Sequence, residues 1–210
     1  GKYYLYCPAR DKDGLFRIGV AVSESPTGPF KPEDNYIEGS YSIDPAVLVD
    51  DDDRAYIYYG GLWGGQLEKW KTGEFNPTGG ELEGNYDFNC DALGPMFAEL
   101  NEDMVSFKTA PKNLVILDEN GVPLRATDEE RRYFEGPWMH KYNGKYYLSY
   151  STGTTHYIVY ATADTPDGPF TYQGRIMEPV LGWTTHHSIV EYNGKWYLFY
   201  HDCELSNGIN

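Results

Sequence analysis

The stretch GKYYLSY at residues 144–150 decides the fold of this chain, because three similar stretches occur elsewhere in it. They are GKYYLY at residues 1–6, RAYIYY at residues 54–59 and GKWYLFY at residues 194–200. Each is short and rich in aromatic and aliphatic residues, which is typical of a β-strand. Repetition of one strand indicates that the chain is built from a repeated unit, and a repeat governs the whole fold.

Turn signals precede the last three copies of this strand. An acidic run occupies residues 50–53, and Asn-Gly pairs occupy residues 143–144 and 193–194. Asn-Gly favours the tight turn of a β-hairpin. Before these turns we expect partner strands at residues 43–49, 135–142 and 186–192.

A second repeat lies later in the unit, as SESPTGPF at residues 23–30 and ADTPDGPF at residues 163–170. Its Pro and Gly residues indicate a bend near an outer strand. The unit is therefore about four strands long, and its period from Gly144 to Gly194 is 50 residues. Repeats of this length are typical of sheets arranged radially about an axis, so we predict an all-β protein with a β-propeller fold.

The composition agrees with an all-β protein and narrows its ligands. Aromatic residues make up 16% of the chain, and its 23 Gly and 13 Pro are too many for a helical bundle. Seventeen Lys and Arg against 32 Asp and Glu give a net charge of −15, which argues against nucleic acid or an anionic membrane as partner. No apolar run approaches the roughly 18 residues of a membrane-spanning helix. We expect a soluble protein that binds a neutral ligand such as a sugar and whose three cysteines form no disulfide framework.

The repeat divides the chain into four parts, and the second of them contains a long loop insertion at residues 61–94. The chain begins after one inner strand and stops inside a unit, so we expect a fragment of a larger domain. The third and fourth strands of the second unit are expected at residues 96–100 and 113–117. The parts are a remnant of the first blade at residues 1–40, the second blade at 41–130, the third at 131–180 and the start of the fourth at 181–210.

Two carboxylates and two histidines occupy the starts of the predicted inner strands, namely Asp44, Glu135, His186 and His187. In a propeller these starts meet near the axis on one face. Carboxyl groups flanked by Pro, Trp and apolar residues are poorly solvated, and a like charge nearby raises the pKa of one of them. Such a pair suits general acid catalysis and matches the chemistry of glycoside hydrolysis.

The ends of the second strands reach the same face and offer candidate sugar contacts. We predict that Trp63, Thr152, His156 and His187 bind substrate. Tryptophans stack on sugar faces, but they also fill the gaps between blades. The loop around Trp63 favours the pocket, whereas Trp138 is expected in the core and Trp183 is compatible with either place.

Each predicted site residue also has a plain structural interpretation. Asp44 before Pro45 is compatible with a turn carboxylate, and Glu135 with a surface acid at a strand end. The two histidines are compatible with core or rim residues that bond to the backbone. The run at residues 50–53 lacks the Gly and the distal Glu of a calcium-binding loop, so we expect a solvated hairpin turn.

The sequence resembles glycoside hydrolase family 43, of the β-xylosidase and α-L-arabinofuranosidase type. The resemblance rests on SIDPAV at residues 42–47, FEGPW at 134–138 before NGKYY at 143–147, and HHSIV at 186–190 before NGKWY at 193–197. It implies a five-bladed propeller that acts on arabinose- and xylose-containing plant polysaccharides. About four blades are represented, without the first inner strand and the last blade.

The resemblance also implies roles for individual residues. Glu135 matches the general acid, and Asp44 matches the carboxylate that orients this acid and raises its pKa. The general base, an Asp on the first inner strand, is expected outside this sequence, so the fragment alone is expected to lack activity. A calcium ion or a water on the propeller axis would be anchored by a histidine, with His186 as first choice and His187 as second. One imidazole with waters makes a weak calcium site.

The resemblance implies an inverting enzyme that removes xylose or arabinose from hemicellulose. The loop at residues 61–94 is expected to narrow a groove into a pocket, which favours exo action on terminal sugars. The alternatives are an endo-arabinanase and a carbohydrate-binding propeller without turnover. The expected partner is a xylo- or arabino-oligosaccharide, with no nucleic acid, no membrane and no organic cofactor. An open ring exposes strand edges, which favours self-association or a complementing segment. The sequence is compatible with secreted, periplasmic or cytoplasmic placement in a microbe that degrades plant polysaccharides.

Overall fold

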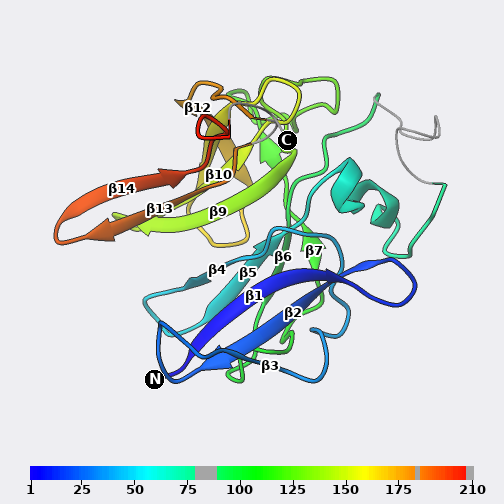
Figure 1. Ribbon diagram of the computed structural model, residues 1–210. Coiled ribbons are helices and arrows are strands. Elements are labelled where there is room, and N and C mark those ends of the chain that lie inside the picture. Colours follow the sequence, from blue (N-terminus) through cyan, green and yellow to red (C-terminus); the bar gives the residue numbers. More distant parts are fainter. Residues whose placement is uncertain (79–88, 183–184, 207–210) are drawn as a thin grey trace.

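The computed structural model describes residues 1–78, 89–182 and 185–206, and its regular structure consists of four twisted β-sheets and two short 3-10 helices (Figure 1). The predicted all-β fold is therefore confirmed. None of the helices that the structure describes is long and apolar enough to cross a bilayer. The central part of the predicted insertion, residues 79–88, and Trp183 lie outside the described residues.

The sheets follow one another along the chain. The first contains β1 (Tyr3–Arg10), β2 (Phe16–Ser23) and β3 (Lys31–Pro32), and the second contains β4 (Ala46–Val49), β5 (Ala55–Tyr59), β6 (Met96–Glu99) and β7 (Lys112–Asn113). The third has the order β8 (Ile116–Leu117), β12 (Phe170–Met177), β11 (Ile158–Ala163), β10 (Lys145–Ser151) and β9 (Glu135–Tyr142). The fourth pairs β13 (His187–Tyr192) with β14 (Lys195–Tyr200), and the 3-10 helices η1 (Trp63–Gly65) and η2 (Leu67–Trp70) follow β5.

The last three aromatic stretches form the second strands of their hairpins, as predicted, whereas the first copy forms β1 and pairs with the β2 that follows it. β9 and β10 pair with Tyr142 opposite Lys145, and β13 and β14 pair with Tyr192 opposite Lys195. Both residues of the Asn143-Gly144 turn have positive φ, at 48° and 75°. This backbone shape requires residues that tolerate the left-handed region, which Asn and Gly do.

The strand expected at residues 113–117 divides between two sheets. Lys112–Asn113 completes the second sheet as β7, whereas Ile116–Leu117 pairs in parallel with β12 of the third. Leu114 between them is buried with 1% exposure. The chain therefore crosses from one sheet to the next within this segment, and the crossing joins the two sheets through backbone hydrogen bonds.

The strands predicted as inner strands, β4, β9 and β13, belong to three successive sheets, and β9 contacts both β4 and β13 (Figure 1). β5, which pairs with β4 in the second sheet, is buried along its whole length. Tyr58 of β5 donates a hydrogen bond to the carbonyl oxygen of Pro166 at 2.8 Å, which joins the second sheet to the third. The core thus holds the starts of the inner strands in fixed relative positions.

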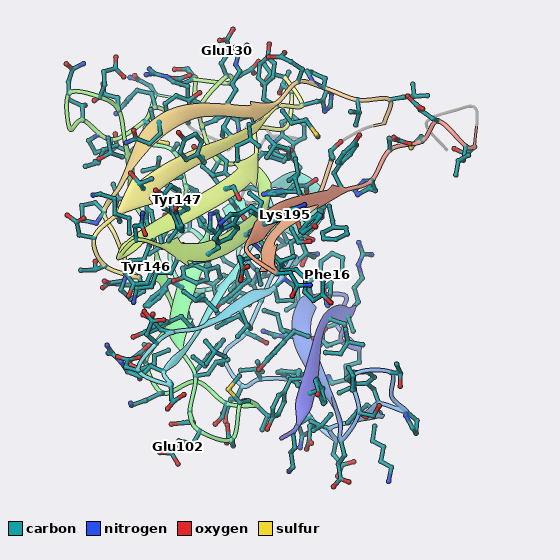
Figure 2. All side chains as sticks on the ribbon, turned by 90° about the vertical axis from the view of Figure 1, so that its left-hand side faces the viewer. Phe16, Glu102, Glu130, Tyr146, Tyr147 and Lys195 are labelled. Atoms are coloured by element: carbon teal, nitrogen blue, oxygen red, sulfur yellow. The ribbon has the colours of Figure 1, made fainter. Side chains whose placement is uncertain are left out.

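A buried carboxylate links the far ends of β4 and β9. Asp50 follows β4, is 7% exposed, and lies 2.6 Å from the Lys141 ammonium through Oδ1. Its Oδ2 accepts a hydrogen bond from Tyr146, which Figure 2 shows on the side of the third sheet nearer to β4. The acidic run was expected to be a solvated turn, and the structure corrects this for Asp50, while Asp51 and Asp53 are exposed.

We predict that Asp50→Asn lowers the stability of the chain at pH 7 by about 1–3 kcal/mol, because it removes a buried charge from two charge-assisted hydrogen bonds. Burial raises the pKa of Asp50, but hydrogen bonds from Lys141 and Tyr146 outweigh burial and hold this pKa below its usual range. The stabilisation is therefore complete above about pH 4 and is lost as pH falls through the lower folded-state pKa. Thermal unfolding across pH 2–7 should show the difference from wild type shrinking in acid.

The matched control is Asp53→Asn on the same turn, since Asp53 is exposed and its φ of 62° suits Asn. An equal destabilisation by both variants, or an Asp50→Asn effect that does not depend on pH, would contradict the linking role of Asp50.

Candidate active site

Three titratable side chains meet where the inner strands begin. Asp44 lies just before β4, Glu135 is the first residue of β9, and His186 lies just before β13. Their possible ligand atoms all lie within 4.8 Å of one another. His186 Nε2 is 3.3 Å from Glu135 Oε1 and 3.7 Å from Asp44 Oδ2. Residues that are far apart in sequence are close here because neighbouring inner strands start at the same level.

A β-bulge directs Glu135 toward this meeting point. In the pairing of β9 with β10, Trp138 lies opposite Ser149 and Glu135 opposite Ser151, so β9 carries one extra residue. Gly136 provides the bulge with a φ of 63°. Without the extra residue Glu135 and Trp138 would point to opposite faces of the strand, and the bulge removes this alternation. Gly136 also donates its backbone N–H to Asp44 Oδ2 at 3.2 Å.

The segment that presents Asp44 has an unusual backbone. Ser42 and Asp44 have φ values of 67° and 60°, which non-glycine residues rarely adopt. Ser42 is fully buried, and its Oγ accepts the N–H of Gly61 at 2.9 Å and donates to the carbonyl of Gly65 at 2.7 Å. The loop after β5 therefore holds this segment in place. Strain of this kind persists only where surrounding contacts determine the conformation, and it is common at functional sites.

Glycine is required where this loop crosses the site. A Cβ at Gly61 would meet Ile43 at 2.9 Å and Glu135 at 3.2 Å, and a Cβ at Gly65 would meet Ile43 at 2.7 Å. The loop can therefore pass against both the Asp44 segment and Glu135 only without side chains at these positions.

The charges of the site shift its pKa values. Burial raises the pKa of Asp44 to about 6, with a further upward contribution from Glu135, while His186 and the Gly136 N–H oppose the rise. Burial lowers the pKa of His186, but the hydrogen bond with Glu135 and the two negative charges outweigh it and raise the pKa overall. Burial lowers the pKa of His187 to about 4. The pKa values of these two adjacent histidines are thus shifted in opposite directions.

Two of the predicted sugar contacts lie close to the carboxylates. Trp63 packs edge-to-face against Phe134, the residue before Glu135, with ring centroids 4.9 Å apart. The backbone N–H of Trp63 donates a hydrogen bond to Glu68 Oε2 at 2.8 Å. His187 follows His186 directly, and its Nε2 lies 2.6 Å from Ser149 Oγ. Sugar binding by Trp63 and His187 stays a prediction.

The other two predicted sugar contacts lie in the loop between β10 and β11. Thr152 is fully buried, and its hydroxyl bonds within the loop to Thr155 at 2.6 Å and to the N–H of Tyr157 at 3.0 Å. His156 has a φ of 56°, and its backbone N–H donates a hydrogen bond to the carbonyl oxygen of Gly153 at 2.8 Å. Thr152 therefore shapes the loop, and contact of either residue with sugar stays a prediction.

The side chains at this point do not match the ligand set that calcium needs. Calcium prefers about six to eight oxygen ligands. At this point the described residues provide the carboxylates of Asp44 and Glu135 and one imidazole of His186. His186 Nε2 already faces both carboxylates. These residues do not form a calcium cage.

A model of the family described as glycosyl hydrolases family 43 matches residues 1–92 and 94–210. The chain belongs to glycosyl hydrolase family 43. The resemblance predicted from the sequence is confirmed, and all the residues of the Asp44, Glu135 and His186 cluster lie within the matched segments.

Curated relatives within family 43 are similar over nearly the whole chain. A protein named xylosidase/arabinosidase 43A from Humicola insolens is 62% identical over 100% of this chain and 65% of its own length. A protein named β-xylosidase from Xylanibacter ruminicola is 56% identical over 99% of this chain and 63% of its own length. The chain thus spans slightly less than two thirds of the length of these relatives.

Solved structures of family 43 agree with the fold. One is a β-xylosidase/α-arabinofuranosidase from a compost microbial metagenome, described as a xylotriose complex in a calcium-free form. Its sequence is 61% identical, and the match has a TM-score of 0.94 and covers 99% of this chain and 63% of that chain. An enzyme from Xanthomonas citri, described as a complex with xylose, is 55% identical with a TM-score of 0.95, over 100% of this chain and 62% of that chain.

We predict that Asp44→Asn raises the stability of the chain at pH 7 by about 1–3 kcal/mol, because a pKa of about 6 in the folded state means that burial penalises the ionised form. The unfolded chain releases this proton near pH 4, so wild type loses stability as pH rises from about 4 to 6. Thermal unfolding should show a gain of several degrees at pH 7 that is nearly absent at pH 4.

The stability test of Asp44→Asn needs no activity and no ligand. A variant that unfolds at a lower temperature than wild type throughout this pH range would contradict the strained, poorly solvated environment of Asp44.

Proposed function

We propose that the protein is an inverting glycosidase that removes terminal xylose or arabinose from plant hemicellulose, as an exo-acting β-xylosidase, an α-L-arabinofuranosidase or both. The observation that carries this proposal is the contact of Asp44, Glu135 and His186 at the start of three inner strands of a family 43 chain. Relatives with 56–62% identity, which are named xylosidase/arabinosidase and β-xylosidase, support the substrate class.

Glu135 is proposed as the general acid. Hydrolysis of a glycoside requires a proton on the leaving oxygen, and a carboxylic acid can supply it. Glu135 is 9% exposed and is the first residue of β9. Its bulge, and the close packing of Gly61 against its Cβ, restrict the positions of its carboxyl group.

Asp44 is proposed to orient Glu135 and to hold the proton on it by its own negative charge. Its carboxylate lies within 4.8 Å of that of Glu135. An acid and a base that act across a water molecule stand about 6.5–9.5 Å apart. This separation supports a tuning role for Asp44 and argues against Asp44 as the water-activating base.

A five-bladed propeller is the proposed architecture, with the four described sheets as members of the ring. The blade limits predicted at residues 1–40, 41–130, 131–180 and 181–210 belong to this proposal. On β14 the side chains of Trp196, Tyr197, Phe199 and Tyr200 are 42–58% exposed. Apolar exposure on this scale supports coverage by further strands of the ring or by another copy. The water-activating base is proposed on an inner strand of the first blade.

The exo mode is supported by the loop after β5, which passes directly over the site. Gly61 packs against Ile43 and Glu135, Gly65 at the end of η1 packs against Ile43, and η2 continues the loop. A groove that is blocked on one side admits the end of a sugar chain more easily than its middle. This favours exo action over the endo-arabinanase alternative.

A metal ion at His186 stays a separate prediction. An ion there would take most of its ligands from water, because the described residues offer one imidazole and two carboxylates. Bound calcium would supply a positive charge near the carboxylates.

We predict that Glu135→Gln lowers kcat on xylobiose by at least about a hundredfold, because the leaving sugar then receives no proton. An aryl β-xyloside with a good leaving group needs little protonation, so its kcat should fall much less. Steady-state kinetics of the protein at its natural length measures both values, and product binding measured by calorimetry should change little.

Glu130→Gln is the control for loss of a carboxylate charge, since Figure 2 shows Glu130 at the outer edge of the molecule, where it pairs with Arg175 at 2.9 Å. Its kinetics should match wild type. Wild-type turnover of xylobiose by Glu135→Gln would refute the assignment, and binding of xylo-oligosaccharides without any hydrolysis by wild type would favour the non-catalytic propeller.

A further inference from the structure

Two side chains of the third sheet hold β13 in place. Ser149 of β10 is fully buried, and its Oγ lies 2.6 Å from His187 Nε2 at the first residue of β13. Trp138 of β9 donates its indole N–H to the carbonyl oxygen of Ile189 at 2.8 Å. Ser149 and Trp138 lie opposite each other in the pairing of β9 with β10. The two bonds therefore connect one level of the third sheet to two points of β13.

The hydrogen bond with Ser149 holds His187, the residue that directly follows His186 of the Asp44, Glu135 and His186 cluster. His186 precedes His187 directly, and its ring lies 3.1 Å from the position of a Cβ on Gly136. The same ring is 3.3 Å from Glu135 and 3.7 Å from Asp44. A shift of the start of β13 would therefore move His186 relative to both carboxylates.

Besides these two bonds, the fourth sheet contacts the third through Trp196 of β14, whose ring lies 5.1 Å from that of His140 and 5.6 Å from that of Tyr142. It contains β13 and β14, and most residues of both strands are partly or fully exposed. A two-stranded sheet is marginally stable by itself, so its position depends on contacts with its neighbour. Buried hydrogen bonds are well suited to set such a position, because their geometry is directional.

We propose that Ser149 is a positioning residue for proton donation, which acts through His187 to hold His186 against Glu135 and Asp44. The inference rests on the proposed function. Ser149 does not touch the reacting atoms; it sets the place of the side chain that touches the acid. Small displacements of catalytic groups have large effects on rate, about a hundredfold for 1 Å.

The test is the variant Ser149→Ala in the protein at its natural length. On xylobiose, whose leaving sugar needs a proton, kcat should fall about tenfold to a hundredfold while KM stays within about twofold. On an aryl β-xyloside with a good leaving group, kcat should fall by less than about threefold. This dependence on the leaving group separates misplaced proton donation from a general loss of folded protein.

Two further variants complete the kinetic design. Trp138→Phe keeps an aromatic ring but removes the N–H of the second bond, so it should show the same leaving-group dependence, and it serves if Ser149→Ala folds poorly. Ser40→Ala is the control, because Ser40 is also fully buried and its Oγ accepts the N–H of Ile18 at 3.0 Å in the first half of the chain. It should lower stability without changing the ratio of the two kcat values.

A crystal structure of Ser149→Ala provides a readout that does not need activity. The distance from His186 Nε2 to Glu135 Oε1 should lengthen beyond the wild-type 3.3 Å. If wild type hydrolyses neither substrate, the proposed function fails, and this distance alone decides the inference. An unchanged distance, an equal loss of kcat on both substrates, or no loss at all would overturn the positioning role of Ser149.

Discussion

The structure depends on one constraint: the inner strands β4, β9 and β13 start at the same level beside one another. Contacts between β9 and β13 recur at matching positions, from Glu135 with His186 to Trp138 with Ile189. The far ends of β4 and β9 are joined as well, through Asp50 and Lys141. Packing of the sheets therefore brings together Asp44, Glu135 and His186, which no local segment of the chain could do. Sheets of this kind form a rigid base for catalytic groups, because a shift of one strand is resisted along its whole length.

The two ends of these strands differ in their energetics. At the Asp50 end the buried charge has two side-chain partners, and its interactions favour the folded state. At the Asp44 end a buried carboxylate has a raised pKa, Ser42 and Asp44 have left-handed backbones, and β9 contains a bulge. Proteins often concentrate such features at functional sites and balance them elsewhere. The contrast between the two ends therefore supports the Asp44 end as the functional one.

The sequence predicted the parts of this structure that have a local signal. The repeated aromatic strands, the Asn-Gly turns and the carboxylates at inner-strand starts follow from composition, spacing and repeat. The crossing at residues 113–117 was missed, because β7 and β8 are each only two residues long and only tertiary packing assigns them to different sheets. The burial of Asp50 and the bond from Ser149 to His187 were also missed. Each depends on a residue of another sheet, for which the sequence has no local signal, although Gly-Pro after Glu135 was a usable sign of a bulge.

The central claim is that Asp44 and Glu135 form one proton-donating unit, since their carboxylates lie within 4.8 Å and so are too close to act across a water molecule. The most direct test is the stereochemistry of the first product, followed by proton NMR during hydrolysis of a β-xyloside by the protein at its natural length. The account predicts that α-xylose appears first, because the water must then be activated by a separate, more distant carboxylate. Initial release of β-xylose would contradict it, because retention would make Asp44 a nucleophile.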